Sequence, residues 1–206
     1  MTVSGIVFDF GGVMTTCTMP DRVRPIVEKL GLSWSALANG FERYRRQMDG
    51  DMITMDEMYG RIWADAGISV SPEIQARILE EDVASFLYRN ERTLAWMQDL
   101  KARGYRIGIL TNMSSEFGKR FRETFHDFIE LSDAMVISGE ARMYKPMREI
   151  YELLQGRIAL RPGELCFIDD VEGNCAGARS AGWRAIRFTD NDKAAAALDL
   201  ELQKDF

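Results

Sequence analysis

The stretch Ile6–Gly12, which reads IVFDFGG, decides the fold of this 206-residue chain. An apolar run leads directly to an aspartate, Asp9, and two glycines follow within three residues. Similar apolar runs lead to three further polar positions along the chain: Thr111, Lys145 and the pair Asp169-Asp170. Such runs, separated by helical stretches, are typical of parallel strands that are buried on both faces. Because ligands bind beyond the carboxyl ends of such strands, we expect these polar residues to meet in one crevice.

The composition is that of an ordinary globular protein, with 46% hydrophobic and 28% charged residues. A net charge of -6 argues against nucleic acid or an anionic membrane as the main partner, because those surfaces attract clustered Lys and Arg. No basic segment followed by a long apolar stretch opens the chain, and no apolar run is long enough to cross a bilayer, so we expect a cytoplasmic protein. Three cysteines without paired spacing predict buried thiols. The chain is expected to be a monomer or a homodimer.

The pattern of the chain predicts two domains. Residues 20–89 show helical periodicity without strand-like runs, and we interpret them as a small helical cap domain. Two helix starts are legible there: a capping box at Thr54–Glu57 and a capping Ser71 before a proline. Residues 1–19 and 90–206 form the predicted core domain, in which helices and strands alternate from Glu91 onward. The predicted fold class is therefore α/β, a three-layer doubly wound parallel sheet with a helical cap inserted after the first strand.

The order of the polar motifs resembles the haloacid dehalogenase superfamily, whose members are mostly magnesium-dependent phosphatases. Four segments carry the resemblance: Asp9-Phe10-Gly11-Gly12-Val13, Thr111-Asn112, Lys145-Pro146, and Asp169-Asp170 with Asn174. The resemblance covers the whole core and, through the position of the insertion, the cap. The implied substrate is a small phosphorylated metabolite, such as a sugar phosphate.

The resemblance assigns a role to each motif residue. Asp9 is the expected nucleophile, which would form an aspartyl phosphate and split hydrolysis into two easier displacements. Lys145 supplies positive charge, and Thr111 donates to the phosphate oxygens. Asn112, Gly11 and Gly12 are expected to bind the phosphate. Mg²⁺ would be bound by Asp9, Asp170 and the main-chain carbonyl of Gly11. Asp169 and Asn174 would orient these groups.

One position departs from the pattern of most phosphatases in this superfamily. Those enzymes carry a second aspartate two residues beyond the nucleophile, which protonates the leaving oxygen, whereas this chain has Gly11. A general acid typically accelerates such a step roughly 100-fold to 10,000-fold. We therefore expect either leaving groups that need little protonation or an acid borrowed from the cap or from water. Subfamilies with Asp-x-Gly in this motif, such as sugar 1-phosphate phosphatases, are still phosphatases.

Two other functions remain open at this point. A 2-haloacid dehalogenase also uses an aspartate nucleophile without the second acid, but it needs no metal, whereas the pair Asp169-Asp170 suits one. A degenerate phosphatase kept as a binding protein is the non-enzymatic alternative. The basic cluster Arg43, Arg45 and Arg46 is either a solvated helix face or a substrate-facing edge of the cap.

Overall fold

A computed structural model describes residues 2–203 of the chain. Its centre is a parallel sheet with the strand order β3-β2-β1-β4-β5. The strands are β1 (Gly5–Phe8), β2 (Arg106–Thr111), β3 (Ala134–Ile137), β4 (Leu165–Asp169) and β5 (Arg184–Arg187). The first strand in the sequence lies in the middle of the sheet, paired with β2 on one side and β4 on the other. The carboxyl ends of strands that are far apart in sequence therefore meet at one edge.

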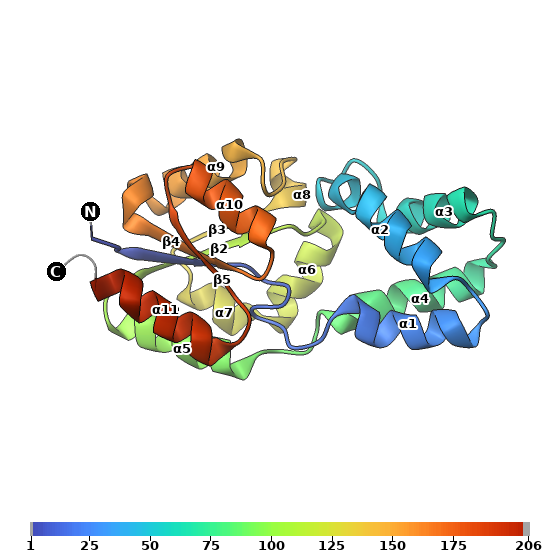
Figure 1. The fold of residues 1–206 in the computed structure, drawn as a ribbon, viewed down its shortest axis with the longest axis horizontal. Helices are drawn as coiled ribbons and strands as arrows, with labels where there is room; N and C mark the ends of the chain where they lie inside the picture. Colours follow the sequence, from blue (N-terminus) through green and yellow to red (C-terminus); the bar gives the residue numbers. More distant parts are fainter. Residues whose placement is uncertain (1, 204–206) are drawn as a thin grey trace.

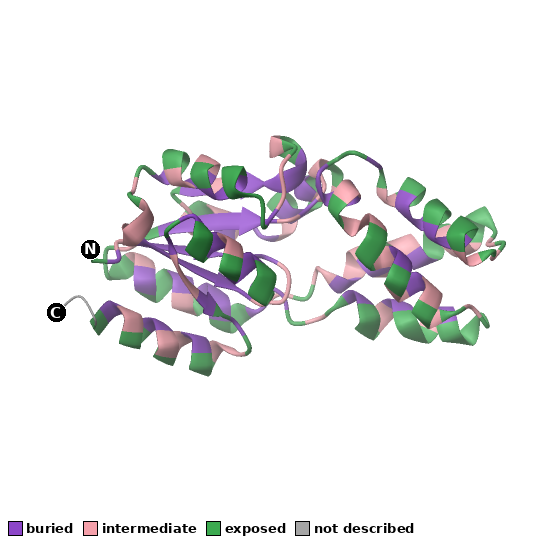
Figure 2. Ribbon diagram, turned by 45° about the horizontal axis from the view of Figure 1, so that its top comes forward, coloured by how far each residue is buried: buried purple, intermediate pink, exposed green. Residues whose placement is uncertain are grey.

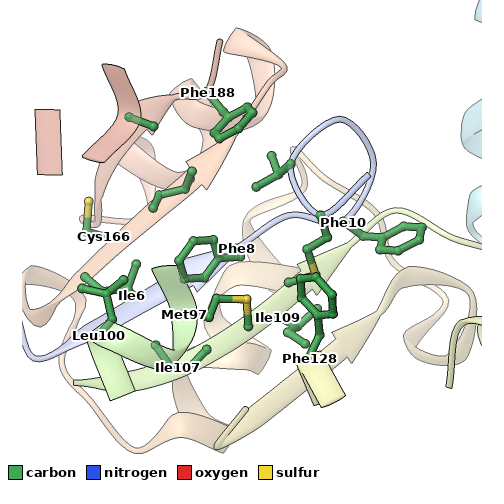
Figure 3. Close-up of a cluster of buried hydrophobic side chains, with 14 of the residues drawn as sticks. Ile6, Phe8, Phe10, Met97, Leu100, Ile107, Ile109, Phe128, Cys166 and Phe188 are labelled. Carbon is green, nitrogen blue, oxygen red and sulfur yellow. The ribbon is translucent and has the colours of Figure 1, made fainter. Parts of the chain in front are cut away.

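Alternate residues of the strands point to opposite faces of the sheet, as the pleat requires. Ile6 and Phe8 of β1 contribute to one apolar cluster, and Val7 between them contributes to the other. Figure 3 shows the first cluster, in which side chains of β1, β2 and β4 meet Met97 and Leu100 of a covering helix. Both faces of the sheet are thus closed by helices, which explains why the strands read as continuous apolar runs.

The helices form a layer on each face of the sheet (Figure 1). The face of the first cluster is covered by α5 (Glu91–Ala102), α6 (Ser115–Thr124), α7 (His126–Leu131) and α11 (Asn191–Gln203). The opposite face is covered by α9 (Arg148–Ile158) and α10 (Glu172–Ser180). Two short elements, α8 (Ser138–Ala141) and the 3₁₀ helix η1 (Pro162–Glu164), complete this part. The architecture confirms the predicted three-layer α/β fold with a parallel sheet.

A second group of helices lies beyond the carboxyl ends of the strands (Figure 1). It contains α1 (Met19–Lys29), α2 (Trp34–Asp49), α3 (Met55–Ala66) and α4 (Pro72–Ser85), which we call the cap helices. They share an apolar cluster of their own, built around side chains such as Val23, Leu37 and Met58. Figure 2 shows the resulting pattern, with buried faces turned inward and exposed faces outward. The arrangement is consistent with the predicted cap, and the boundaries at residues 20 and 89 stay a proposal.

The local signals in the cap helices act as predicted. Thr54 accepts a hydrogen bond from the Glu57 amide at 3.1 Å, and the Glu57 carboxylate accepts one from the Thr54 amide at 2.9 Å. Ser71 caps α4 through the amide of Ile74. The alanines at 194–197 favour a weak terminal helix, and α11 extends well beyond them. The sequence analysis did not delimit α7, α8 or α9. None of the helices between residues 2 and 203 is long and apolar enough to span a membrane.

Candidate active site

The predicted site residues lie where the central strands end. Asp9 directly follows β1, and its amide donates to the carbonyl of Ile168 in β4 at 2.9 Å. Asp169 is the last residue of β4, and Asp170 follows it. Because β1 and β4 are paired in parallel, the three aspartates lie side by side. One carboxylate oxygen of each lies within 4.8 Å of the others.

Lys145 connects two of these carboxylates. Its Nζ lies 2.7 Å from Asp9 Oδ1 and 2.7 Å from Asp169 Oδ2, and the side chain is fully buried. Burial alone would lower the pKa of Lys145, but the carboxylates of Asp169 and Asp9 outweigh it and raise the pKa. Asn112 fixes the backbone of this residue: its Oδ1 accepts from the Lys145 amide at 2.7 Å, and its Nδ2 donates to the Lys145 carbonyl at 3.1 Å. Lys145 is therefore a charged lysine in a fixed position.

The Asp9 carboxylate presents one free oxygen. Its Oδ1 accepts from the Phe10 amide at 2.7 Å and contacts Lys145, so Oδ2 is the oxygen available for other chemistry. Burial raises the pKa of Asp9 well above its ordinary value, and the neighbouring Asp169 adds to this rise. Burial also raises the pKa of Asp170. Close, buried carboxylates resist joint ionisation, and a divalent cation between them would relieve that repulsion.

The residues around the carboxylates fit a magnesium ion. Mg²⁺ prefers oxygen ligands, and it binds through one or two carboxylates while it keeps several waters. Asp170 is half-buried, and within residues 2–203 its carboxylate has no ion-pair partner. Gly12 has a φ of +73°, and a Cβ there would lie 2.6 Å from Asp170 Oδ2. A glycine is thus needed where the loop after β1 approaches the Asp170 carboxylate.

Asp169 is fully engaged by protein groups. Its carboxylate accepts from Asn174 Nδ2 at 3.1 Å and 3.0 Å, and from the Val171 amide at 2.8 Å. The carbonyl of Asn174 in turn accepts from the Tyr151 hydroxyl at 2.8 Å. These contacts hold the carboxylate that lies 2.7 Å from Lys145 Nζ, and the orienting role of Asp169 and Asn174 stays a prediction.

A cavity of about 360 Å³ opens beside the carboxylates. The predicted residues among its lining are Asp9, Gly11, Gly12, Asn112, Lys145, Asp170 and Asn174. Thr111, the last residue of β2, is buried and does not line this cavity. The amide of Gly12 donates to Thr15 Oγ1 at 3.0 Å, so this amide is already occupied and does not point freely at a ligand. The predicted phosphate-binding roles of Thr111 and Gly12 therefore have less support than those of Asn112 and Lys145.

The sequence analysis missed the aromatic wall of the cavity. Phe86, just after α4, lies close to Gly11: a Cβ at Gly11 would be 3.4 Å from Phe86 Cε1. Phe10, Phe41 and Phe117 also line the cavity. No local signal could have revealed Phe86, because it lies far from Gly11 in the sequence and reaches it only through the position of α4.

Two polar contacts join the cap helices to the core beside this cavity. Ser138 Oγ donates to the carbonyl of Asp49 at 2.6 Å, and it accepts from the Met113 amide at 2.7 Å. Asp51 Oδ1 accepts from the Ser115 amide, in the first turn of α6, at 2.9 Å. An acceptor at this place satisfies an amide that the helix itself leaves unpaired. The loop after α2 is therefore held directly over the ends of β2 and β3.

Known proteins share this fold and much of this sequence pattern. A family model described as haloacid dehalogenase-like hydrolase matches residues 3–182. An (S)-2-haloacid dehalogenase of Pseudomonas sp. (strain CBS-3) is 29% identical over 94 residues, which cover 46% of this chain and 41% of that protein. A phosphatase of Mycobacterium tuberculosis is 23% identical over 195 residues, which cover 90% of this chain and 87% of that protein. The chain thus spans only about two fifths of the dehalogenase, but most of the phosphatase.

Solved structures agree in fold. A HAD family enzyme of Bacteroides thetaiotaomicron, in complex with magnesium and inorganic phosphate, superposes with a TM-score of 0.66 and 21% identity, covering 90% of this chain and 93% of that one. An L-2-haloacid dehalogenase of Xanthobacter autotrophicus, with chloropropionic acid covalently bound, gives a TM-score of 0.66 and 13% identity, covering 94% and 81%. At these identities the comparison establishes the shared fold.

Proposed function

Because the chain belongs to the haloacid dehalogenase-like hydrolase family, we propose that it hydrolyses small phosphate monoesters with Asp9 as nucleophile and Mg²⁺ as cofactor. The observation that carries this proposal is the cluster of Asp9, Asp169 and Asp170 oxygens within 4.8 Å, beside a fully buried Lys145. The relative named as a phosphatase, and the neighbour solved with magnesium and inorganic phosphate, support it.

In the proposed reaction, the free Oδ2 of Asp9 attacks phosphorus, and the bond between phosphorus and the ester oxygen breaks. The ester oxygen leaves as an oxyanion and takes a proton from water, and an aspartyl phosphate remains on Asp9. Water then attacks phosphorus, which releases inorganic phosphate and restores the carboxylate. Bound magnesium, held by Asp9, Asp170 and the Gly11 carbonyl, would supply positive charge to the phosphate oxygens. Lys145 adds a second positive charge, which its contacts with Asp9 and Asp169 keep in place.

The surroundings of Gly11 govern which esters should react. Phe86 occupies the space beside Gly11, so the region where most relatives of this superfamily carry an acid is apolar in this chain. The leaving oxygen therefore departs without a carboxylic acid at that position. We infer that esters with acidic leaving groups, such as phenols, react faster than alkyl esters.

The dehalogenase relatives support a second candidate function. The same Asp9 oxygen could displace a halide from a 2-haloacid, and the apolar walls of the cavity suit such a substrate. Three clustered carboxylates disfavour this reaction, because they outnumber the single charge of Lys145 and without a metal ion would repel the carboxylate of the haloacid. A binding protein without turnover is the third candidate, and the free Oδ2 of Asp9 argues against it.

Product release distinguishes these candidates. Phosphate release from phenyl phosphate and from an alkyl phosphate is measured with magnesium and with a chelator, and chloride release is measured from 2-chloropropionate. We expect magnesium-dependent phosphate release that disappears in Asp9→Asn. Chloride release that survives the chelator would instead establish the dehalogenase. Binding of phenyl phosphate without any turnover would establish the binding protein.

A further inference from the structure

The structure separates the three arginines of the basic cluster in α2. Arg43 points away from the cavity and pairs with Asp65 at 2.7 Å, and Arg46 is exposed. Arg45 alone of the three lines the cavity that contains Asp9. The two readings of this cluster thus apply to different residues: a solvated face for Arg43 and Arg46, and a substrate-facing position for Arg45.

Arg45 is held in place by three neighbours. Its Nε donates to Asp49 Oδ1 at 2.7 Å. Its guanidinium carbon lies 4.9 Å from the ring centroid of Phe41 and 5.5 Å from that of Phe86. Aromatic faces attract a guanidinium and restrict its motion without using its hydrogen-bond donors. Among the described residues, Nη1 and Nη2 of Arg45 have no hydrogen-bond partner. Their donors are therefore free for a ligand.

Two acidic groups lie near Arg45. Asp49 and Asp82 are both buried nearby, and the Tyr59 hydroxyl donates to Asp82 Oδ2 at 2.8 Å. Burial raises the pKa of both aspartates, and the charge of Arg45 opposes this rise. Burial would lower the pKa of Arg45, but the same two carboxylates outweigh it and keep the guanidinium charged. Arg45 is thus a charged guanidinium in the cavity lining, paired through Nε with Asp49 and without a protein hydrogen bond at Nη1 or Nη2 among the described residues.

The rest of the cavity limits what can bridge Arg45 and the catalytic end. Its walls are mainly apolar and include the aromatic rings of Phe10, Phe86 and Phe117. Flat apolar groups pack well against such rings. A ligand that fits both ends therefore has a phosphate for Lys145, an apolar body, and a second anionic group for Arg45. A phenolic ester also agrees with the missing acid at Gly11.

We propose that Arg45 determines substrate specificity by binding a carboxylate on the leaving group, so that the substrate class is a carboxylate-bearing aryl phosphate. This inference rests on the proposed phosphatase function. Arg45 donates through Nη1 and Nη2 to the carboxylate, while Asp49, Phe41 and Phe86 restrict the position of the guanidinium. The reacting phosphate lies at the other end, beside Asp9 and Lys145.

A pair of matched esters tests the proposal. The esters 4-carboxyphenyl phosphate and 4-carbamoylphenyl phosphate are nearly the same size but differ by one charge. We expect kcat/KM of the unaltered protein to be about 10- to 100-fold higher for the carboxylate ester, because hydrogen bonds to charged groups have this strength. Arg45→Gln should bring the two values within about 3-fold, and Arg45→Lys should restore part of the difference. The matched control Arg46→Gln should keep the full preference.

Several outcomes overturn the proposal. Equal kcat/KM for the two esters in the unaltered protein would overturn the proposal. This comparison needs no variant, so the test stands even if Arg45→Gln does not fold. The proposal is also overturned if Arg45→Gln keeps the preference for the carboxylate ester, or if Arg46→Gln loses it to the same extent. If no ester is turned over, the phosphatase function fails by itself. Calorimetric binding of the two esters to the unaltered chain then tests Arg45 independently, and equal affinity refutes its role.

Discussion

Gly177 provides a sharp test of how the site is supported. It lies in α10, in a stretch of small residues that allows the helix to pack closely against its neighbours. A Cβ at this position would lie 2.7 Å from Pro146 Cβ and 2.7 Å from the Tyr151 hydroxyl. Both neighbours belong to the support of the site: Pro146 follows Lys145, and Tyr151 donates to the Asn174 carbonyl. Gly177→Ala therefore forces a methyl group between the two.

The expected cost follows from three effects. Alanine favours a helix over glycine by about 1 kcal/mol. Inserting a methyl group into a packed core costs about 1–3 kcal/mol. Displacing the Tyr151 hydroxyl from Asn174 costs about 1 kcal/mol more if the carbonyl is left unpaired. The free energy of unfolding should fall by about 1–3 kcal/mol, because the two costs outweigh the helix preference. For a chain of this size, that lowers the Tm by about 2–12 °C.

Gly173 in the same helix is the matched control. Nothing lies within 4 Å of a Cβ placed there, so Gly173→Ala should raise the free energy of unfolding by about 0.5–1 kcal/mol. Urea unfolding followed by circular dichroism measures both variants against the unaltered chain. If Gly177→Ala is as stable as Gly173→Ala, then α10 yields to the methyl group and the packing argument is wrong. Hydrolysis of phenyl phosphate should also fall in Gly177→Ala, because Asn174 orients Asp169.

Three further results are expected. Lys145→Met should abolish phosphate release and lower the free energy of unfolding in urea by about 3–5 kcal/mol, because two buried carboxylates lose their cation. An unchanged free energy of unfolding would contradict this role of Lys145. Hydrogen bonds from Arg89 lower the pKa of Asp127 in the folded chain. The Asp127 carboxylate therefore stabilises the fold at pH values above its unfolded pKa of about 4. This stabilisation is lost as the pH falls through the lower pKa of the folded chain. Asp127→Asn should therefore be less stable at pH 7, by about 1 kcal/mol or less, and the difference should vanish in acid; a difference independent of pH would refute the ion pair. Burial raises the pKa of Cys166 and Cys175 to about 12. A thiol reagent at pH 8 should therefore modify one cysteine in the folded chain and three in urea. Rapid modification of all three cysteines in the folded chain would show that Cys166 and Cys175 are not buried.

Local sequence signals determined much of this protein. The apolar runs ending at Asp9 and Asp169 specified buried parallel strands, because a strand covered by helices on both faces has no side chains that face solvent. The polar residues after these runs specified where the candidate site lies, because parallel strands end at one edge of the sheet. The capping residues Thr54 and Ser71 specified helix starts, because their hydrogen bonds span only three residues.

Only the tertiary structure decided which side chains complete the cavity. Arg43 and Arg45 are two residues apart on one helix, and the position of α2 against the core selects Arg45 to face the cavity. Phe86 fills the space beside Gly11 because α4 ends there. Periodicity records which face of an element is apolar, but the element that it packs against is set by contacts between distant segments.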